Sequence, residues 1–147
     1  MSNTTTAGSY AAPAIAGASQ DTLALIGRVL IALLFVPAGF GKLTGFAGVV
    51  GYIASVGLPM PQLGALIAIV VELGLGILLL VGYKTRFTAI VLAVFTVATA
   101  VIFHNYWAMP ADKAYVNQLM FFKNIAIAGG LLAIAALGAG RFSIDRK

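Results

Sequence analysis

One carboxylate, Glu72, stands inside the apolar stretch IAIVVELGLGILLLVGYK, which begins at Ile67. No other charged side chain lies between Gln62 and Lys84. An isolated ionised acid in hydrocarbon is costly, so a buried carboxyl group either pairs with a cation or takes up a proton. Two chemistries suit Glu72: an ion pair that fixes helix register, or an acid that moves protons or binds the head group of a quinone-like molecule.

Four further polar residues are candidates for the same intramembrane site: Arg28, His104, Lys123 and Asn124. Arg28 and Lys123 are the cations expected to reach Glu72, one from each side of its depth. A bidentate contact between Arg28 and Glu72 is the stronger of the two geometries. His104 suits either hydrogen bonding at the membrane surface or proton exchange at the mouth of a site.

The sequence lacks the residues that several kinds of cofactor require. The chain has no cysteine, which excludes disulfides and thiolate ligands within it, and its single histidine has no nearby second His or paired acid to make a metal ligand set. The motifs GxxxxGK, HExxH and GxSxG are missing from the sequence. We therefore expect no metal or thiol cofactor, and electrons for any redox reaction would come from a partner or from a quinone.

The elements that must position these residues are long and apolar. Of the 147 residues, 61% are hydrophobic and 9% are charged, whereas soluble domains carry about 25% charged residues. A helix needs roughly 20 apolar residues to cross a bilayer. Spans are expected at about 22–41, 62–82, 86–104 and 117–137. The sequence thus predicts an all-α fold, an integral membrane four-helix bundle covering residues 22–138.

Three shorter segments flank or connect these spans. The stretch FAGVVGYIASVG, between the first two spans, has apolar residues at helical spacing but is too short to cross. We expect a short helix there that lies in the membrane interface or against the bundle. Residues 1–21, rich in Thr, Ser and Ala, are expected to be a disordered tail. Residues 139–147 form a basic tail.

The net charge of +5 is spread over loops and termini without a Lys/Arg run. That pattern does not indicate nucleic-acid binding, and the expected partners are membrane lipids. Lys42 and Lys113 are expected to be interface anchors.

Several stretches in this order resemble the DoxX family of small four-helix membrane proteins. They are IGRVLIALLFVPAGFGKLTGF, YIASVGLPMP followed by VVELGLGILLLVGYKTRFTAIVL, and the closing GAGRFSIDRK. The resemblance covers about residues 23–147. It implies a bacterial inner-membrane protein, associated in some relatives with quinol oxidation, thiosulfate–quinone chemistry or oxidative-stress protection. Arg28 and Glu72 match the family's intramembrane polar positions, whereas cysteine-borne electron transfer does not carry over.

The leading expectation is therefore an accessory or quinone-interacting subunit that works with other membrane redox proteins. Glu72 would exchange a proton or accept a hydrogen bond, Arg28 would hold its charge, and His104 would serve the outer mouth. Two alternatives stay open: a structural or assembly module without a ligand, and a small transporter whose path the same polar residues would line. Whether the chain is an enzyme is not decided by its residues.

Orientation follows from basic residues near the spans, because cytoplasmic loops carry more Lys and Arg. Four crossings place both termini and the 82–86 link on one side, with five basic residues there against two opposite. We expect both termini in the cytoplasm. A reporter that is active only outside the cytoplasm, fused after Lys147, should stay inactive, and activity there would reverse the assignment.

Overall fold

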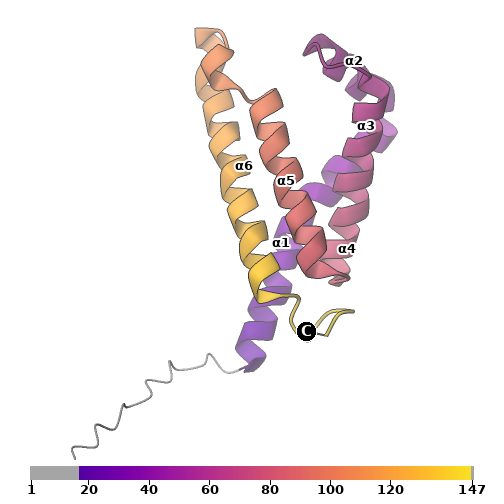
Figure 1. Ribbon diagram of the computed structural model, residues 1–147, viewed down its shortest axis with the longest axis vertical. Helices are drawn as coiled ribbons and strands as arrows, with labels where there is room; N and C mark the ends of the chain where they lie inside the picture. The colour runs from indigo at the N-terminus through magenta and orange to yellow at the C-terminus, as the bar shows by residue number, and fades with distance from the viewer. Residues whose placement is uncertain (1–16, 147) are drawn as a thin grey trace, which may run out of the picture.

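The computed structural model describes residues 17–146, and these fold entirely into helices, turns and a C-terminal tail (Figure 1). The helices, in chain order, are α1 (Gly17–Thr44), α2 (Phe46–Ser55), α3 (Pro61–Ile69), η1 (Val70–Leu75), α4 (Gly76–Val81), α5 (Thr85–Phe103), η2 (Tyr106–Ala108) and α6 (Ala111–Leu137). The segments α3, η1 and α4 follow one another without a break. Together they form one span.

The described residues contain four helices long and apolar enough to cross a membrane, which confirms the predicted architecture. They are Ser19–Thr44, Pro61–Val81, Thr85–Ala108 and Ala111–Leu137. The short helix expected between the first two spans is α2. Residues 1–16 of the predicted tail at 1–21 lie outside the described residues. Residues 17–21 belong to α1.

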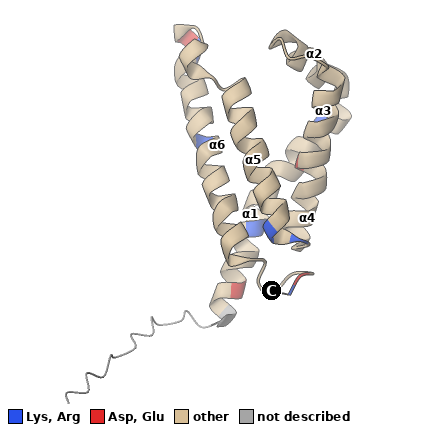
Figure 2. Ribbon diagram, in the orientation of Figure 1, with Lys and Arg blue, Asp and Glu red and all other residues tan. Residues whose placement is uncertain are grey.

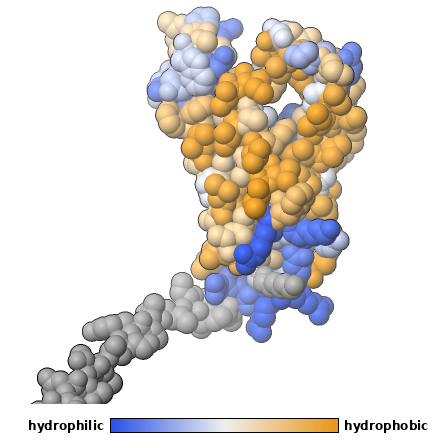
Figure 3. All heavy atoms as spheres, in the orientation of Figure 1, coloured by the Kyte–Doolittle hydropathy of each residue, from blue (hydrophilic) through white to orange (hydrophobic). Residues whose placement is uncertain are grey.

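The helices converge at one end and separate at the other. Figure 1 shows α5 and α6 as one pair, with α1 crossing behind them toward the pair formed by α2 and α3. Figure 3 shows an apolar outer surface and a hollow between the two arms, near the end that carries α2. The apolar surface suits contact with lipid, since hydrocarbon replaces water around the spans.

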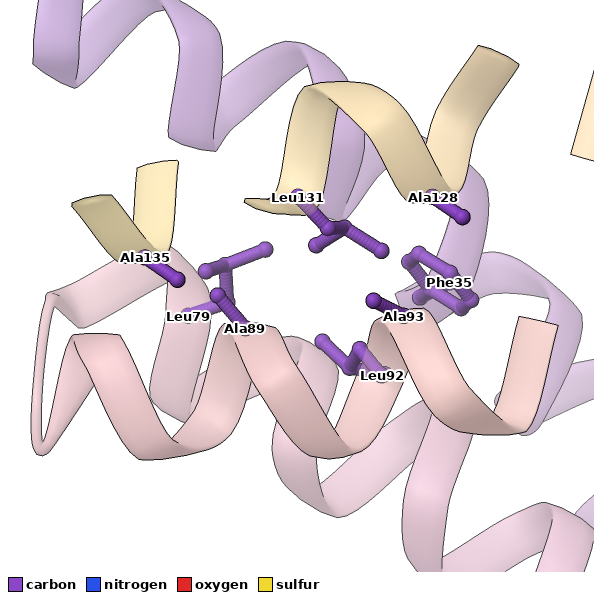
Figure 4. Packing of buried hydrophobic residues seen from close by; sticks show 8 residues of the cluster. All are labelled: Phe35, Leu79, Ala89, Leu92, Ala93, Ala128, Leu131 and Ala135. Carbon is purple, nitrogen blue, oxygen red and sulfur yellow. The ribbon is translucent and has the colours of Figure 1, made fainter. Parts of the chain in front are cut away.

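Small residues allow the helices to approach closely in the core. The core cluster comprises Phe35, Leu79, Ala89, Leu92, Ala93, Ala128, Leu131 and Ala135 (Figure 4). Alanines on α5 and α6 bring these two helices together, as is usual where lipid supplies no hydrophobic drive for association. On α1, Gly39 lies so close to η1 that a Cβ there would collide with the backbone of Leu73.

The C-terminal tail folds back beneath the converging end. The Ile144 and Asp145 N–H groups donate to the carbonyls of Val81 (3.1 Å) and Gly82 (3.0 Å). The Asp145 carboxylate accepts the N–H groups of Lys84 (2.9 Å) and Thr85 (2.8 Å), at the start of α5. These donors have no partner inside their own helix, so the tail supplies a helix cap from about 60 residues away.

Arg28 joins α1 to the end of α4 and to the tail. Its fully buried guanidinium donates to the carbonyls of Leu80 (2.9 Å) and Phe142 (2.5 Å), with a longer contact to Leu79 (3.4 Å). Carbonyls in the last turn of a helix lack partners and carry the negative end of the helix dipole, so they suit a cation. Gly82, in the left-handed region at φ +70°, leaves room for the guanidinium, which a Cβ there would meet.

Replacing Arg28 with Gln should destabilise the bundle, because buried carbonyls would lose their donors. Hydrogen bonds to a charged group contribute about 1.5–3 kcal/mol each, so we expect a loss on the order of 3 kcal/mol or more in SDS or thermal unfolding. Arg86→Gln, at the same end of the bundle but exposed, is the matched control and should change stability by less than about 0.5 kcal/mol. Equal effects of the two variants would show that Arg28 does not fasten this end.

Candidate intramembrane ligand site

Glu72 lies within η1, a six-residue π-helical segment between two α-helical ones. In a π-helix each hydrogen bond spans one residue more than in an α-helix, and single turns of this kind often occur at functional sites. Here the turn occurs in the middle of a span, where α1 crosses closest. The Glu72 side chain is mostly buried, with 12% of its surface exposed.

The partner of Glu72 is Lys42. The lysine Nζ lies 2.6 Å from Oε2 of Glu72, and the lysine comes from the last turn of α1. The ammonium is thus held both by the carboxylate and by the negative end of the α1 dipole. The contact joins the first span to the π turn of the second.

The predicted pairing of Glu72 with Arg28 or Lys123 is wrong. Arg28 lies at the converging end, where it binds backbone carbonyls, and Lys123 Nζ contacts Met120 Sδ at 3.1 Å. The error has a geometric cause. Ending the first span at residue 41 made Lys42 an interface anchor, whereas α1 continues to Thr44 and brings the partly buried Lys42 side chain to Glu72.

A cavity of about 480 Å³ opens beside the ion pair, between the two arms. Of the predicted site residues, it brings together Glu72, His104 and Asn124, and leaves out Arg28 and Lys123. Apolar side chains from α1, α3 and α5 form most of the wall, including Leu34, Ile67, Phe95 and Ile102. Thr96 and Thr99 add hydroxyl groups, although both hydroxyls donate within α5.

Aromatic and polar side chains surround the cavity at the end that carries α2. Tyr52 of α2 and Phe103 of α5 both line it and stack with ring centroids 5.6 Å apart, so they connect the two arms. His104 Nδ1 lies 3.2 Å from Asn117 Oδ1. Since Asn117 donates its amide to the Lys113 carbonyl, the hydrogen-bond network assigns the proton to Nδ1 of His104. In a neutral ring, Nε2 is then an acceptor.

This arrangement can hold a molecule with an apolar body and a small polar group. Ligand sites are concave, mostly apolar and contain a few polar groups that fix orientation, within roughly 300–1,000 Å³. The ammonium of Lys42 can donate to an oxygen, and the carboxylate of Glu72 can accept a hydrogen bond or a proton. Among the described residues, no group of three His, Cys, Asp or Glu side chains could hold a metal ion.

Lys42 and Tyr52 are site residues that sequence reasoning missed. Lys42 follows a Gly-rich exit, PAGFGK, which looks like the end of a helix, and Tyr52 lies in the short segment between the first two spans. One signal was available for Lys42. A helix extended by three residues would have placed it one turn from the membrane surface on the same span as Arg28.

Comparisons with known proteins give a consistent result. The sequence model of the DoxX family matches residues 23–105. Inner membrane protein YphA of Escherichia coli is 44% identical over 131 residues, covering 89% of this chain and 94% of that protein. Inner membrane protein YqjF of the same organism is 42% identical, covering 86% and 92%. No solved structure matches significantly.

A more distant relative is the ER-derived vesicles protein ERV29 of Saccharomyces cerevisiae. It is 30% identical over 129 residues, which cover 88% of this chain but 34% of that protein.

A double-mutant cycle should show that Lys42 and Glu72 stabilise each other. Lys42→Met or Glu72→Leu alone leaves one partly buried charge without its partner, and we expect each to lose about 1–3 kcal/mol in SDS unfolding. The double variant Lys42→Met/Glu72→Leu should recover much of that loss, since two apolar side chains replace the pair. Additive losses would mean that the two side chains act independently.

Proposed function

The chain belongs to the DoxX family of membrane proteins, and from this premise we propose that it binds the head group of a quinone-type lipid in the cavity beside Glu72. In this proposal it is an accessory subunit of membrane redox chemistry in the bacterial inner membrane. The relatives' names support the membrane assignment. The observation that carries the ligand proposal is a mostly apolar intramembrane cavity with an ion pair in its wall.

The chemistry of the wall suits such a head group. A quinone offers carbonyl oxygens, and the Lys42 ammonium is a donor that can reach one of them from the cavity wall. A quinol offers O–H groups, for which the Glu72 carboxylate is an acceptor. The apolar remainder of the cavity accepts the ring, and its opening toward lipid gives the tail a way out.

Proton exchange is a second task that the site supports. Reduction of a quinone to a quinol takes up two electrons and two protons. Electrons would come from a partner protein, while Glu72 and His104 supply a carboxylate and an imidazole in the cavity wall for proton exchange.

A purely structural role is an alternative explanation for the buried polar residues. The Arg28 contacts fasten α1, α4 and the tail and need no ligand, which fits the structural alternative. The Lys42–Glu72 pair could likewise only fix the crossing of α1 and η1. That alternative gives no reason for an open cavity beside the pair, and the quinone proposal does.

The proposed orientation, with both termini in the cytoplasm, also gains support from the position of Lys42. This lysine was one of the two basic residues counted on the opposite side, and its charge is engaged by Glu72 within the bundle. The tail end carries Lys84, Arg86, Arg141 and Arg146 (Figure 2).

Quinone binding should stabilise the purified protein against heat. A ligand that binds only the folded state at 100 times its Kd adds about 2.7 kcal/mol, so decylubiquinone should raise the melting temperature by several degrees. Thr99→Phe, which fills the cavity, should abolish the shift, and Val94→Phe, on the lipid-facing side of the same helix, should keep it. Glu72→Gln should reduce it.

The same measurement separates the alternatives. If decylubiquinone stabilises wild type and Thr99→Phe equally, the molecule binds elsewhere and the cavity is not its site. If it never raises the melting temperature while the Lys42–Glu72 cycle shows strong coupling, the pair is structural.

A further inference from the structure

Lys123 is a charged residue halfway along a membrane span, turned away from the rest of the bundle. It lies 12 residues into α6, about 18 Å from the first Cα of that helix. Its side chain is exposed, and within the described part of the chain no carboxylate lies within ion-pair distance of it. Among the described residues its ammonium has one hydrogen-bond partner, the thioether Sδ of Met120. Figure 2 shows this basic segment midway along α6.

The face of α6 around Lys123 is unpartnered within the chain. Only 11% of the most apolar window of this helix is buried, against 22–33% in the other three spans. The next residue, Asn124, lines the cavity, whereas Lys123, about 100° around the helix from it, is exposed on the outer surface. One turn further along, Ala126 is exposed, and a Cβ added at Gly129 would meet nothing.

A lysine at this depth needs a partner. A charge at the centre of a membrane helix costs about 2.5–3.5 kcal/mol on insertion scales, and such residues usually pair with an opposite charge. The aliphatic part of the Lys123 side chain is long enough to extend toward the membrane interface, yet the ammonium contacts Met120 on the preceding turn. An intramembrane carboxylate is the group that would neutralise it best.

A second copy of this chain has no spare carboxylate to offer at that depth. The sequence has four acidic residues. Glu72 pairs with Lys42, Asp21 pairs with Arg141, and Asp145 caps α5 at the converging end. Asp112 lies in the first turn of α6, about 16 Å along the helix from Lys123. Copies in one membrane share an orientation, so these depths would be the same in a partner copy.

We propose that the outward face of α6 around Lys123 docks a transmembrane helix of a different protein that carries Asp or Glu at the same depth. Ala126 and Gly129 let the backbone of that helix approach, and Lys123 supplies the charge that selects it. This surface lies outside the cavity, so the docking proposal can be tested independently of the quinone proposal.

Site-specific crosslinking in native membranes tests the proposal. The photoreactive residue p-benzoyl-phenylalanine replaces Ala126 in the full-length chain, with Val94 of α5 as the matched lipid-facing control position. We expect Ala126, but not Val94, to crosslink to another protein, through a peptide with Asp or Glu inside its membrane span. Lys123→Met, and the amide variant of the partner's carboxylate, should each lower the yield about tenfold or more. Lys123→Arg should keep it.

Three results would contradict the proposal. An adduct of twice the mass of this chain would mean that a second copy covers α6. Adducts with lipid alone would mean that Lys123 reaches the interface by itself. A protein adduct whose yield is the same in Lys123→Met would remove the charge argument. Because Lys123 contacts no structural residue beyond Met120, Lys123→Met should melt at the wild-type temperature, and Thr99→Phe should leave the adduct unchanged even if it abolishes quinone binding.

Discussion

The buried guanidinium of Arg28 holds together three parts of the chain that are far apart in sequence. It contacts the last turn of α4 and the tail at Phe142, while the same tail caps α5 through Asp145. The Arg28 side chain is fully buried, so the hydrogen bonds of its guanidinium must be made within the protein. One end of the bundle is therefore fastened by polar contacts that join α1, α4, α5 and the tail, although the Nε of Arg28 has no hydrogen-bond partner among the described residues. At the other end the two arms separate around the cavity and are connected by the Tyr52–Phe103 stack.

The two buried cations of α1 have different surroundings and different consequences. Arg28 is fully enclosed and has carbonyl partners, an arrangement that leaves no space for a ligand. Lys42 keeps 30% of its side chain exposed and lines the cavity together with its carboxylate partner. A charge pair with open space beside it can exchange part of its interactions for those of an incoming polar group, whereas an enclosed one cannot. This difference is why the proposed ligand site lies at Lys42 and Glu72.

Sequence reasoning recovered the spans and three of the cavity's polar residues, but not the ion pair in its wall. Glu72, His104 and Asn124 were selected as candidates because a polar group is costly to expose to lipid, and all three line the cavity. Depth estimates alone could not choose among the cations available to Glu72. A three-residue error at the end of the first span moves a side chain about 4.5 Å along the helix and turns it by most of a turn. The close approach at Gly39 and the π turn further shift the register of the second span, and neither is visible in hydropathy.

Composition and hydropathy by themselves determined that this chain is a four-span membrane bundle, since apolar length and the scarcity of charge leave no other fold in which the backbone is satisfied. They also determined that Arg28 and Glu72 had to be buried. Only the tertiary structure decided which partner each one has, because partner choice depends on where α1 ends and how closely it crosses η1. It alone showed that Lys123 faces outward rather than toward Glu72. Hydropathy indicates which residues lie in the membrane spans, whereas the packing of the helices decides which way each side chain points.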